Sequence, residues 1–172
     1  METVSGEVVK KEEISMRKRI IGQGLGEVAA AEPGWMDLEG LAQVEITSED
    51  VDFSIESALI PGTGLGWRAA QPGEQTIRLL FDKPMRIRRI RLVFQENEQE
   101  RTHEFVLRWS SDGGQSYWEI TRQQYNFSPP DTTSEFEDYT VDFDGLTALE
   151  LSIVPDISGG SAFASVAQIR LA

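Results

Sequence analysis

Nucleophiles, acid–base groups and metal ligands other than carboxylates are scarce in this sequence. Its 172 residues include no cysteine and one histidine, His103, beside 29 aspartates and glutamates. Without cysteine, disulfides, thiolate zinc sites and Cys nucleophiles are excluded. A Ser-His-Asp triad would have to use His103, and no Gly-x-Ser-x-Gly elbow accompanies it. The sequence therefore favours a protein that is not an enzyme.

The abundant carboxylates leave one enzymatic alternative open. Two carboxyl groups on either side of a glycosidic bond can hydrolyse it. Glu135, Glu137 and Asp138 lie close together in the sequence, although no pattern indicates that a pocket holds them. A glycan-active hydrolase is therefore the weakest of the functions considered.

A second group of carboxylates suggests a metal site. Glu49, Asp50 and Asp52 follow the first predicted strand, and Ca²⁺ prefers oxygen ligands of this kind. The spacing is not that of an EF-hand. We expect no cofactor, with a structural calcium ion at these three residues as the alternative.

Aromatic residues near predicted turns indicate a ligand-binding surface, because the apolar faces of sugars pack against aromatic rings. Tyr125 and Phe127 precede the Pro-rich stretch Ser128-Pro129-Pro130 and are the strongest candidates. Trp67 has a structural alternative, in which it closes one end of the folded domain. The candidate ligand contacts are Tyr125, Phe127, Trp67, Arg68, His103 and Tyr117.

Two kinds of glycine-containing segment are interpreted as turns. Ser110 to Tyr117 match the Asp-box pattern Ser-x-Asp-x-Gly-x-x-aromatic, which staples hairpins in sialidase propellers. One copy does not make a propeller, so we expect Asp112 to bond the backbone of its own turn. Residues 22–26 and 62–66 lack the Gly-x-Gly-x-x-Gly spacing of a dinucleotide loop and are predicted to be tight turns.

The elements that position these residues are predicted from alternation. From Trp35 onward, apolar residues recur at every second position, the period of a strand with one buried face. Turn signals such as Asp82-Lys83-Pro84 separate the strands, and no long amphipathic helix intervenes. Strands are expected around 41–47, 77–81, 90–94, 105–109, 118–120, 139–143, 149–153 and 163–171. The pattern predicts an all-β fold, an antiparallel β-sandwich or jelly roll of about eight strands.

Charge is unevenly distributed along the chain. The net charge is -13, yet residues 20–67 hold no Lys or Arg and residues 123–172 hold only Arg170. This balance argues against nucleic acid as a partner. Arg78, Arg89 and Arg91 alternate with the apolar positions, so we expect them to point outward and pair with carboxylates of adjacent strands.

Domain organisation and location follow from the first residues and from hydropathy. Residues 1–35 are polar, rich in Glu and Lys, and broken by glycine, which predicts an arm before a domain at 36–172. The charged start does not resemble a secretory signal, and no apolar run has the length of a membrane span. We therefore expect a cytoplasmic protein without membrane attachment.

The order of several segments is informative. Ile46-Thr-Ser-Glu49 leads through Ser57-Ala-Leu59 to Gly66-Trp67-Arg68-Ala69. Gln75 to Pro84 read Gln-x-Ile-x-Leu-x-Phe-x-Lys-Pro and lead into Ile87 to Phe94. Phe105 to Gly114 form a strand and a Ser-x-Asp-Gly turn before Trp118, and 162–171 form a closing strand.

Over about residues 41–171 this order resembles the galactose-binding-like jelly roll, the superfamily of discoidin domains and carbohydrate-binding modules. The resemblance implies that loops at one end of the sandwich recognise a carbohydrate or another small polar ligand. The disulfide of secreted discoidin domains has no counterpart here. A cytoplasmic protein–protein interaction module is the alternative, supported by the predicted N-terminal arm.

Overall fold

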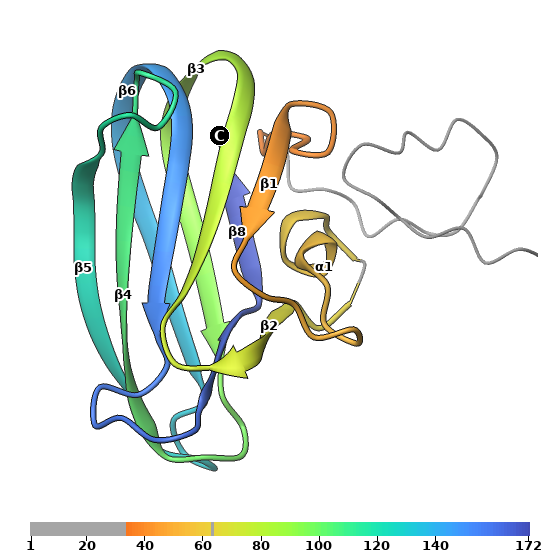
Figure 1. The fold of residues 1–172 in the computed structure, drawn as a ribbon, viewed down its shortest axis with the longest axis vertical. Coiled ribbons are helices and arrows are strands. Elements are labelled where there is room, and N and C mark those ends of the chain that lie inside the picture. The colour runs from red at the N-terminus through yellow and green to blue at the C-terminus, as the bar shows by residue number, and fades with distance from the viewer. Residues whose placement is uncertain (1–33, 63) are drawn as a thin grey trace, which may run out of the picture.

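A computed structural model describes residues 34–62 and 64–172, and strands dominate it (Figure 1). The predicted arm, residues 1–35, and the glycine turn at 22–26 fall almost wholly outside the described residues. The elements are β1 (Ala42–Ile46), α1 (Ile55–Leu59), β2 (Trp67–Pro72), β3 (Gln75–Gln95), β4 (Arg101–Ser110), β5 (Trp118–Phe127), β6 (Ser134–Val154), β7 (Phe163–Val166) and β8 (Gln168–Leu171). The predicted all-β sandwich is confirmed.

Two long strands build both layers of the sandwich. β3 and β6 are 21 residues each and pair antiparallel along their length, from Gln75↔Ile153 to Gln95↔Ser134. The start of β3 and the end of β6 form one layer with β1, β4 and β5. The end of β3 and the start of β6 form the other layer, where β8 pairs with β3. A short antiparallel pair, β2 and β7, lies beside them.

The bend between the layers explains a difference from the sequence prediction. Alternation predicted separate strands before and after Asp82-Lys83-Pro84, whereas the structure has one continuous strand there. The register of β3 against β6 shifts between Leu80 and Met85 and again before Arg89. Such irregularities bend a strand and increase its twist, so a single strand can pass from one layer to the other.

The core lies between the layers and consists of the alternating apolar residues. Ile77 and Leu79 of β3 are 1% exposed, and Phe105 and Leu107 of β4 are 0% exposed. Burying side chains of this size stabilises a fold by roughly 1.5–3 kcal/mol each. The expected strand faces at 77–81, 90–94 and 105–109 are therefore confirmed, although Trp109 is only partly buried against the core.

Arginine side chains lie on the outer faces of both layers and pair with carboxylates of adjacent strands, as predicted. On one layer, Arg78 and Arg108 reach Glu150 at 2.7 and 3.1 Å from the two strands that flank it. On the other layer, Arg89 and Arg91 both reach Asp138, at 2.6 and 3.2 Å. The alternation of charge along the sequence therefore becomes pairing between neighbouring strands.

The Asp-box turn also forms as predicted. Asp112 Oδ1 accepts hydrogen bonds from Ser110 Oγ and from the backbone N–H of Ser116, and Asp112 Oδ2 accepts one from Ser116 Oγ. The turn joins β4 to β5. Within the described residues, no helix is both long and apolar enough to cross a membrane.

Candidate functional site

A pocket of about 330 Å³ lies where β2 and β7 meet the connection between β3 and β4. Figure 1 shows this connection and β2 at the lower end of the sandwich, away from the C-terminus. The walls combine apolar, amide and charged side chains. They are contributed by Phe53, Leu65, Trp67, Arg68, Gln95, Glu96, Asn97, Glu98, Gln99, Arg101, Phe163, Ser165, Val166 and Ala167.

Arg68 is held on one wall by two neighbours. Its Nη2 lies 2.9 Å from Asp50 Oδ2, and its guanidinium lies over the Phe53 ring at 4.0 Å. The backbone N–H of Asp52 and the guanidinium of Arg68 lower the pKa of Asp50, so this carboxylate is ionised at neutral pH. The pairing fixes the orientation of an arginine whose side chain is still 42% exposed.

Arg101 anchors the opposite wall from below. It is 5% exposed, and its Nη1 donates to the carbonyls of Pro155 and Phe163 at 3.1 and 2.9 Å. Its Nε lies 2.9 Å from Glu96 Oε2, while Glu96 Oε1 accepts the backbone N–H groups of Glu98 and Gln99. Burial lowers the pKa of Arg101, and the adjacent Glu96 opposes that effect. The loop 96–100 is thereby tied to the sandwich by a buried cation.

Apolar side chains form the rim. Leu65 is 81% exposed and Phe163 is 42% exposed, although both are large and hydrophobic. Gly66, next to Leu65, has a φ of +96°, and a Cβ there would lie 2.6 Å from Val166 O. The close approach of the two segments at Gly66 needs a residue without a side chain.

Two of the predicted ligand contacts lie at this pocket. Arg68 is on its wall, as described. Trp67 lines it from inside the fold, because this side chain is 1% exposed and its Nε1 donates to Ser48 O at 3.1 Å. The structural alternative for Trp67, closure of the end of the sandwich, fits this burial.

The remaining predicted contacts lie elsewhere. His103 and Phe127 are 2% and 1% exposed, because each strand turns these side chains into the core. Their burial does not support the predicted ligand contact, which stays a prediction at these two residues. Tyr125 is half-buried, stacks edge-on against Phe127 and donates its hydroxyl to Ser134 O at 2.7 Å. Tyr117 is half-buried in the Asp-box hairpin. None of these four lines the pocket.

None of the acidic residues considered for hydrolysis lines the pocket. Glu135 is 2% exposed and its Oε2 lies 2.5 Å from His103 Nε2. Asp138 is on the outer face, paired with Arg89 and Arg91. Alternation along β6 separates Glu135 from Asp138, whereas Glu135 and Glu137 lie on the same side of the strand and interact with each other. Glu135 is buried and Glu137 is half-buried, and neither lines the pocket.

The carboxylates considered for calcium are largely engaged. Glu49 Oε2 accepts the backbone N–H of Ile55, and burial raises the pKa of Glu49. Asp50 pairs with Arg68, and Asp52 is exposed. In residues 34–62 and 64–172, no three acidic or histidine side chains are grouped so that they could hold a metal ion.

The sequence interpretation missed most of the pocket. Phe53, Leu65 and Phe163 come from three different connections or strand ends, and the loop 96–100 contributes further lining residues. The sequence does offer one signal for the pocket, the position of Leu65 between two glycines in the turn at 62–66. A large apolar residue there belongs to no strand that could bury it, and Leu65 is indeed exposed.

Comparisons with known proteins extend the description. No protein-family model matches the sequence, and no curated protein matches it. Solved structures do match. A CBM32 module of AlyQ in complex with 4,5-unsaturated mannuronic acid is 16% identical, with a TM-score of 0.55 over 77% of this chain and 95% of that one.

Two further matches are carbohydrate-binding modules. CBM32-5 from Clostridium perfringens, in complex with GalNAc-β-1,3-galactose, is 18% identical, with a TM-score of 0.55 over 76% of this chain and 94% of that one. A pectin-binding module is 18% identical, with a TM-score of 0.54 over 76% and 89%. The described part of the chain therefore has the β-sandwich fold of these carbohydrate-binding modules.

Proposed function

We propose that this domain is a non-enzymatic module that binds a carbohydrate or a similar small polar ligand in the pocket at the lower end of the sandwich. The observation that carries the proposal is the composition of that pocket. One set of walls joins an exposed aromatic ring, Phe163, to amide side chains and an oriented arginine, Arg68. The similar structures named above include modules described with bound sugars.

The chemistry of the walls suits a sugar. The ring of Phe163 offers an apolar surface for the C–H face of a pyranose. Asn97, Gln95 and Gln99 offer amide donors and acceptors for hydroxyl groups. Arg68 and Arg101 fix the walls before a ligand arrives, which reduces the ordering cost of binding.

A glycan array with the full chain tests the proposal, followed by titration of each bound glycan by NMR. We expect chemical-shift changes at the pocket residues. Phe163→Ala should weaken binding, because it removes the aromatic surface, while the melting temperature changes little. Phe136→Ala is the matched control, since Phe136 is a 59% exposed phenylalanine outside the pocket lining. Silence across the array, or equal effects of the two variants, would contradict the proposal.

A protein partner is the second candidate, and exposed apolar side chains favour it. Val51 is 90% exposed and Leu65 is 81% exposed. Val51 follows Asp50 in the chain, and Leu65 lines the pocket together with Arg68, the ion-pair partner of Asp50. A protein that covers this rim should co-purify with the full chain and be released by Val51→Asp with Leu65→Asp. The sugar-binding proposal expects glycan binding to survive Val51→Asp alone.

The calcium hypothesis stays a prediction with its own measurement. A rise in melting temperature on adding Ca²⁺, removed by chelator and by Asp52→Asn, would support an ion at Glu49, Asp50 and Asp52. An unchanged melting temperature would contradict it.

A further inference from the structure

We infer that the pocket selects uncharged sugars and discriminates against acidic ones such as uronic and sialic acids. The inference rests on the proposed function and concerns the same pocket. It is carried by the way the two cations of the pocket are neutralised and by the carboxylates placed around them.

Neither arginine offers a free positive charge to a ligand. Arg68 is paired with Asp50 at 2.9 Å, and Arg101 is buried and paired with Glu96 at 2.9 Å. Recognition of a sugar carboxylate normally uses a bidentate arginine that has no other anion. In this pocket an acidic ligand would have to displace an existing carboxylate or share its cation.

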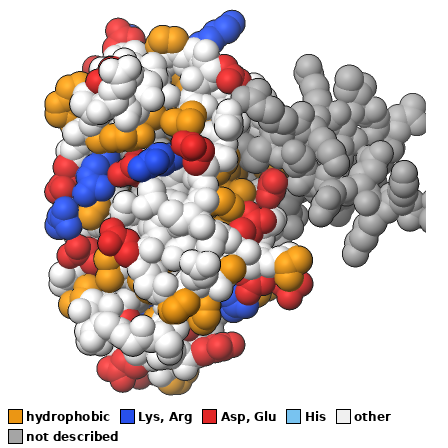
Figure 2. All heavy atoms as spheres, viewed as in Figure 1, with side chains coloured by type: hydrophobic (Ala, Val, Ile, Leu, Met, Phe, Trp, Pro, Cys, Tyr) orange, Lys and Arg blue, Asp and Glu red, His pale blue; other side chains and the backbone are white. Residues whose placement is uncertain are grey.

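Further carboxylates surround the two pairs. Glu98 lines the pocket, and Glu100 lies exposed in the same loop. Asp52 is exposed two residues after Asp50, and Asp156 lies close enough to Arg101 to affect its pKa. Figure 2 shows acidic side chains along the lower part of the face in view. A second anion placed here meets like charge, which lowers both its affinity and its rate of association.

The uncharged groups of the pocket carry no such penalty. The amides of Gln95, Asn97 and Gln99 donate and accept hydrogen bonds regardless of ligand charge, and so does the Ser165 hydroxyl. Arg68 keeps donor capacity toward a neutral hydroxyl, because its hydrogen bonds to Asp50 are made by Nε and Nη2 and do not involve Nη1. Hydroxyl-rich ligands without a carboxylate therefore match the site.

The test is a glycan array with neutral, uronate-containing and sialylated members, followed by titration of matched sugars that differ only in C6 oxidation. We expect the bound glycans to be neutral and the neutral partner of each pair to bind roughly tenfold more tightly at about 20 mM salt, with a smaller ratio at about 300 mM salt. The double variant Glu98→Gln, Glu100→Gln should reduce the ratio of neutral to acidic sugar affinity, because it removes two carboxylates that repel the acidic sugar.

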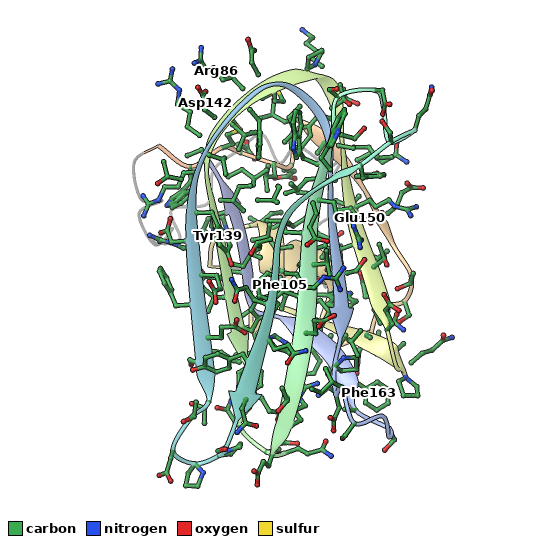
Figure 3. The ribbon with its side chains drawn as sticks, turned by 90° about the vertical axis from the view of Figure 1, so that its left-hand side faces the viewer. Arg86, Phe105, Tyr139, Asp142, Glu150 and Phe163 are labelled. Atoms are coloured by element: carbon green, nitrogen blue, oxygen red, sulfur yellow. The ribbon has the colours of Figure 1, made fainter. Side chains whose placement is uncertain are left out.

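The control removes the same charge elsewhere. Asp142→Asn with Asp144→Asn changes the net charge equally, and Figure 3 shows Asp142 at the opposite end of the sandwich from Phe163. This variant should keep the parent ratio. Tight binding of acidic glycans, or an equal ratio in both double variants, would overturn the inference while leaving carbohydrate binding intact. Silence across the array would overturn the proposed function and the inference together.

Discussion

His103 Nε2 of β4 lies 2.5 Å from Glu135 Oε2 of β6, between the two layers of the sandwich, and both residues are 2% exposed. The rings of Phe94 and Phe127 pack edge-on against the imidazole at 4.7 and 5.0 Å. Burial and the nearby Arg101 lower the pKa of His103 to about 4, and burial raises the pKa of Glu135 to about 7. From these directions we expect the pair to be neutral near pH 5.5, with the proton on Glu135 and a hydrogen bond donated to His103.

The first prediction concerns the titration of this imidazole. Because His103 is the single histidine, its ring signals are unambiguous in an NMR spectrum. We expect a midpoint near 4, well below the usual value of 6.5, because the charged form is disfavoured in the core. A midpoint at or above 6.5 would show that the core holds His103 as an imidazolium.

The second prediction is that two substitutions give opposite pH profiles of stability. The raised pKa of Glu135 contributes stability below 4.5 that is lost as the pH rises to about 7. The lowered pKa of His103 contributes stability above 6.5 that is lost as the pH falls to about 4. In the parent the two trends nearly offset each other, so the pair alone gives a shallow profile.

When one partner is removed, the pH dependence of stability that the other partner causes is no longer offset. Glu135→Gln should lose about 3 kcal/mol of unfolding free energy between pH 7 and pH 4 relative to the parent profile, whereas His103→Gln should lose a similar amount between pH 4.5 and pH 7.5. Urea denaturation across this range measures both. Parallel profiles in the two variants would contradict the assignment of the proton.

The third prediction concerns the Asp-box turn. Hydrogen bonds from Ser110 and Ser116 lower the pKa of Asp112 to about 2. Asp112→Ala leaves these donors without their acceptor, so we expect a lower melting temperature at pH 7. The difference should shrink as the pH falls from 3.8 toward 2, because the parent then loses the same ionised acceptor. Asp144→Ala, an exposed acid on β6, is the control and should melt like the parent.

The fourth prediction separates backbone strain from steric clash at two glycines. Gly66 and Gly73 have φ values of +96° and +86°, but only a Cβ at Gly66 would approach backbone atoms, at 2.6 Å from both Ala167 Cα and Val166 O. Gly73→Ala should cost roughly 1–2 kcal/mol through strain alone. Gly66→Ala should cost clearly more and also weaken glycan binding, because β2 and β7 must move apart beside the pocket. Equal denaturation midpoints for the two variants would count against this account.

Strand faces were predictable because the fold repeats one local rule. Ile77, Leu79, Phe105 and Leu107 are buried where alternation placed them, and Arg78 meets a carboxylate on the next strand. The same rule could have assigned His103, which shares the face of Phe105 and Leu107. Its polarity argued for the surface, whereas the structure supplies Glu135 from the opposite layer as a buried partner.

The pocket was less predictable because its walls come from distant segments. Phe53, the loop 96–100 and Phe163 meet only once both layers have formed, and no periodic pattern joins them. The position of Phe127 just before the Pro-rich stretch 128–130 predicts a ligand contact, but β5 continues to Phe127 and turns its ring inward. Aromatic character near a turn therefore indicates a ligand contact only when no strand face claims the side chain.

The sharing of β3 and β6 between the layers has a consequence for how the domain comes apart. Neither layer consists only of its own strands, because each layer contains one half of β3 (75–95) and one half of β6 (134–154). Local unfolding of one layer would also disrupt the strands that continue into the other layer. We therefore expect no partly unfolded state in which one layer stays intact. The amide protons at the centre of β3 and β6 should then exchange with solvent only through global opening, and the whole domain behaves as one cooperative unit.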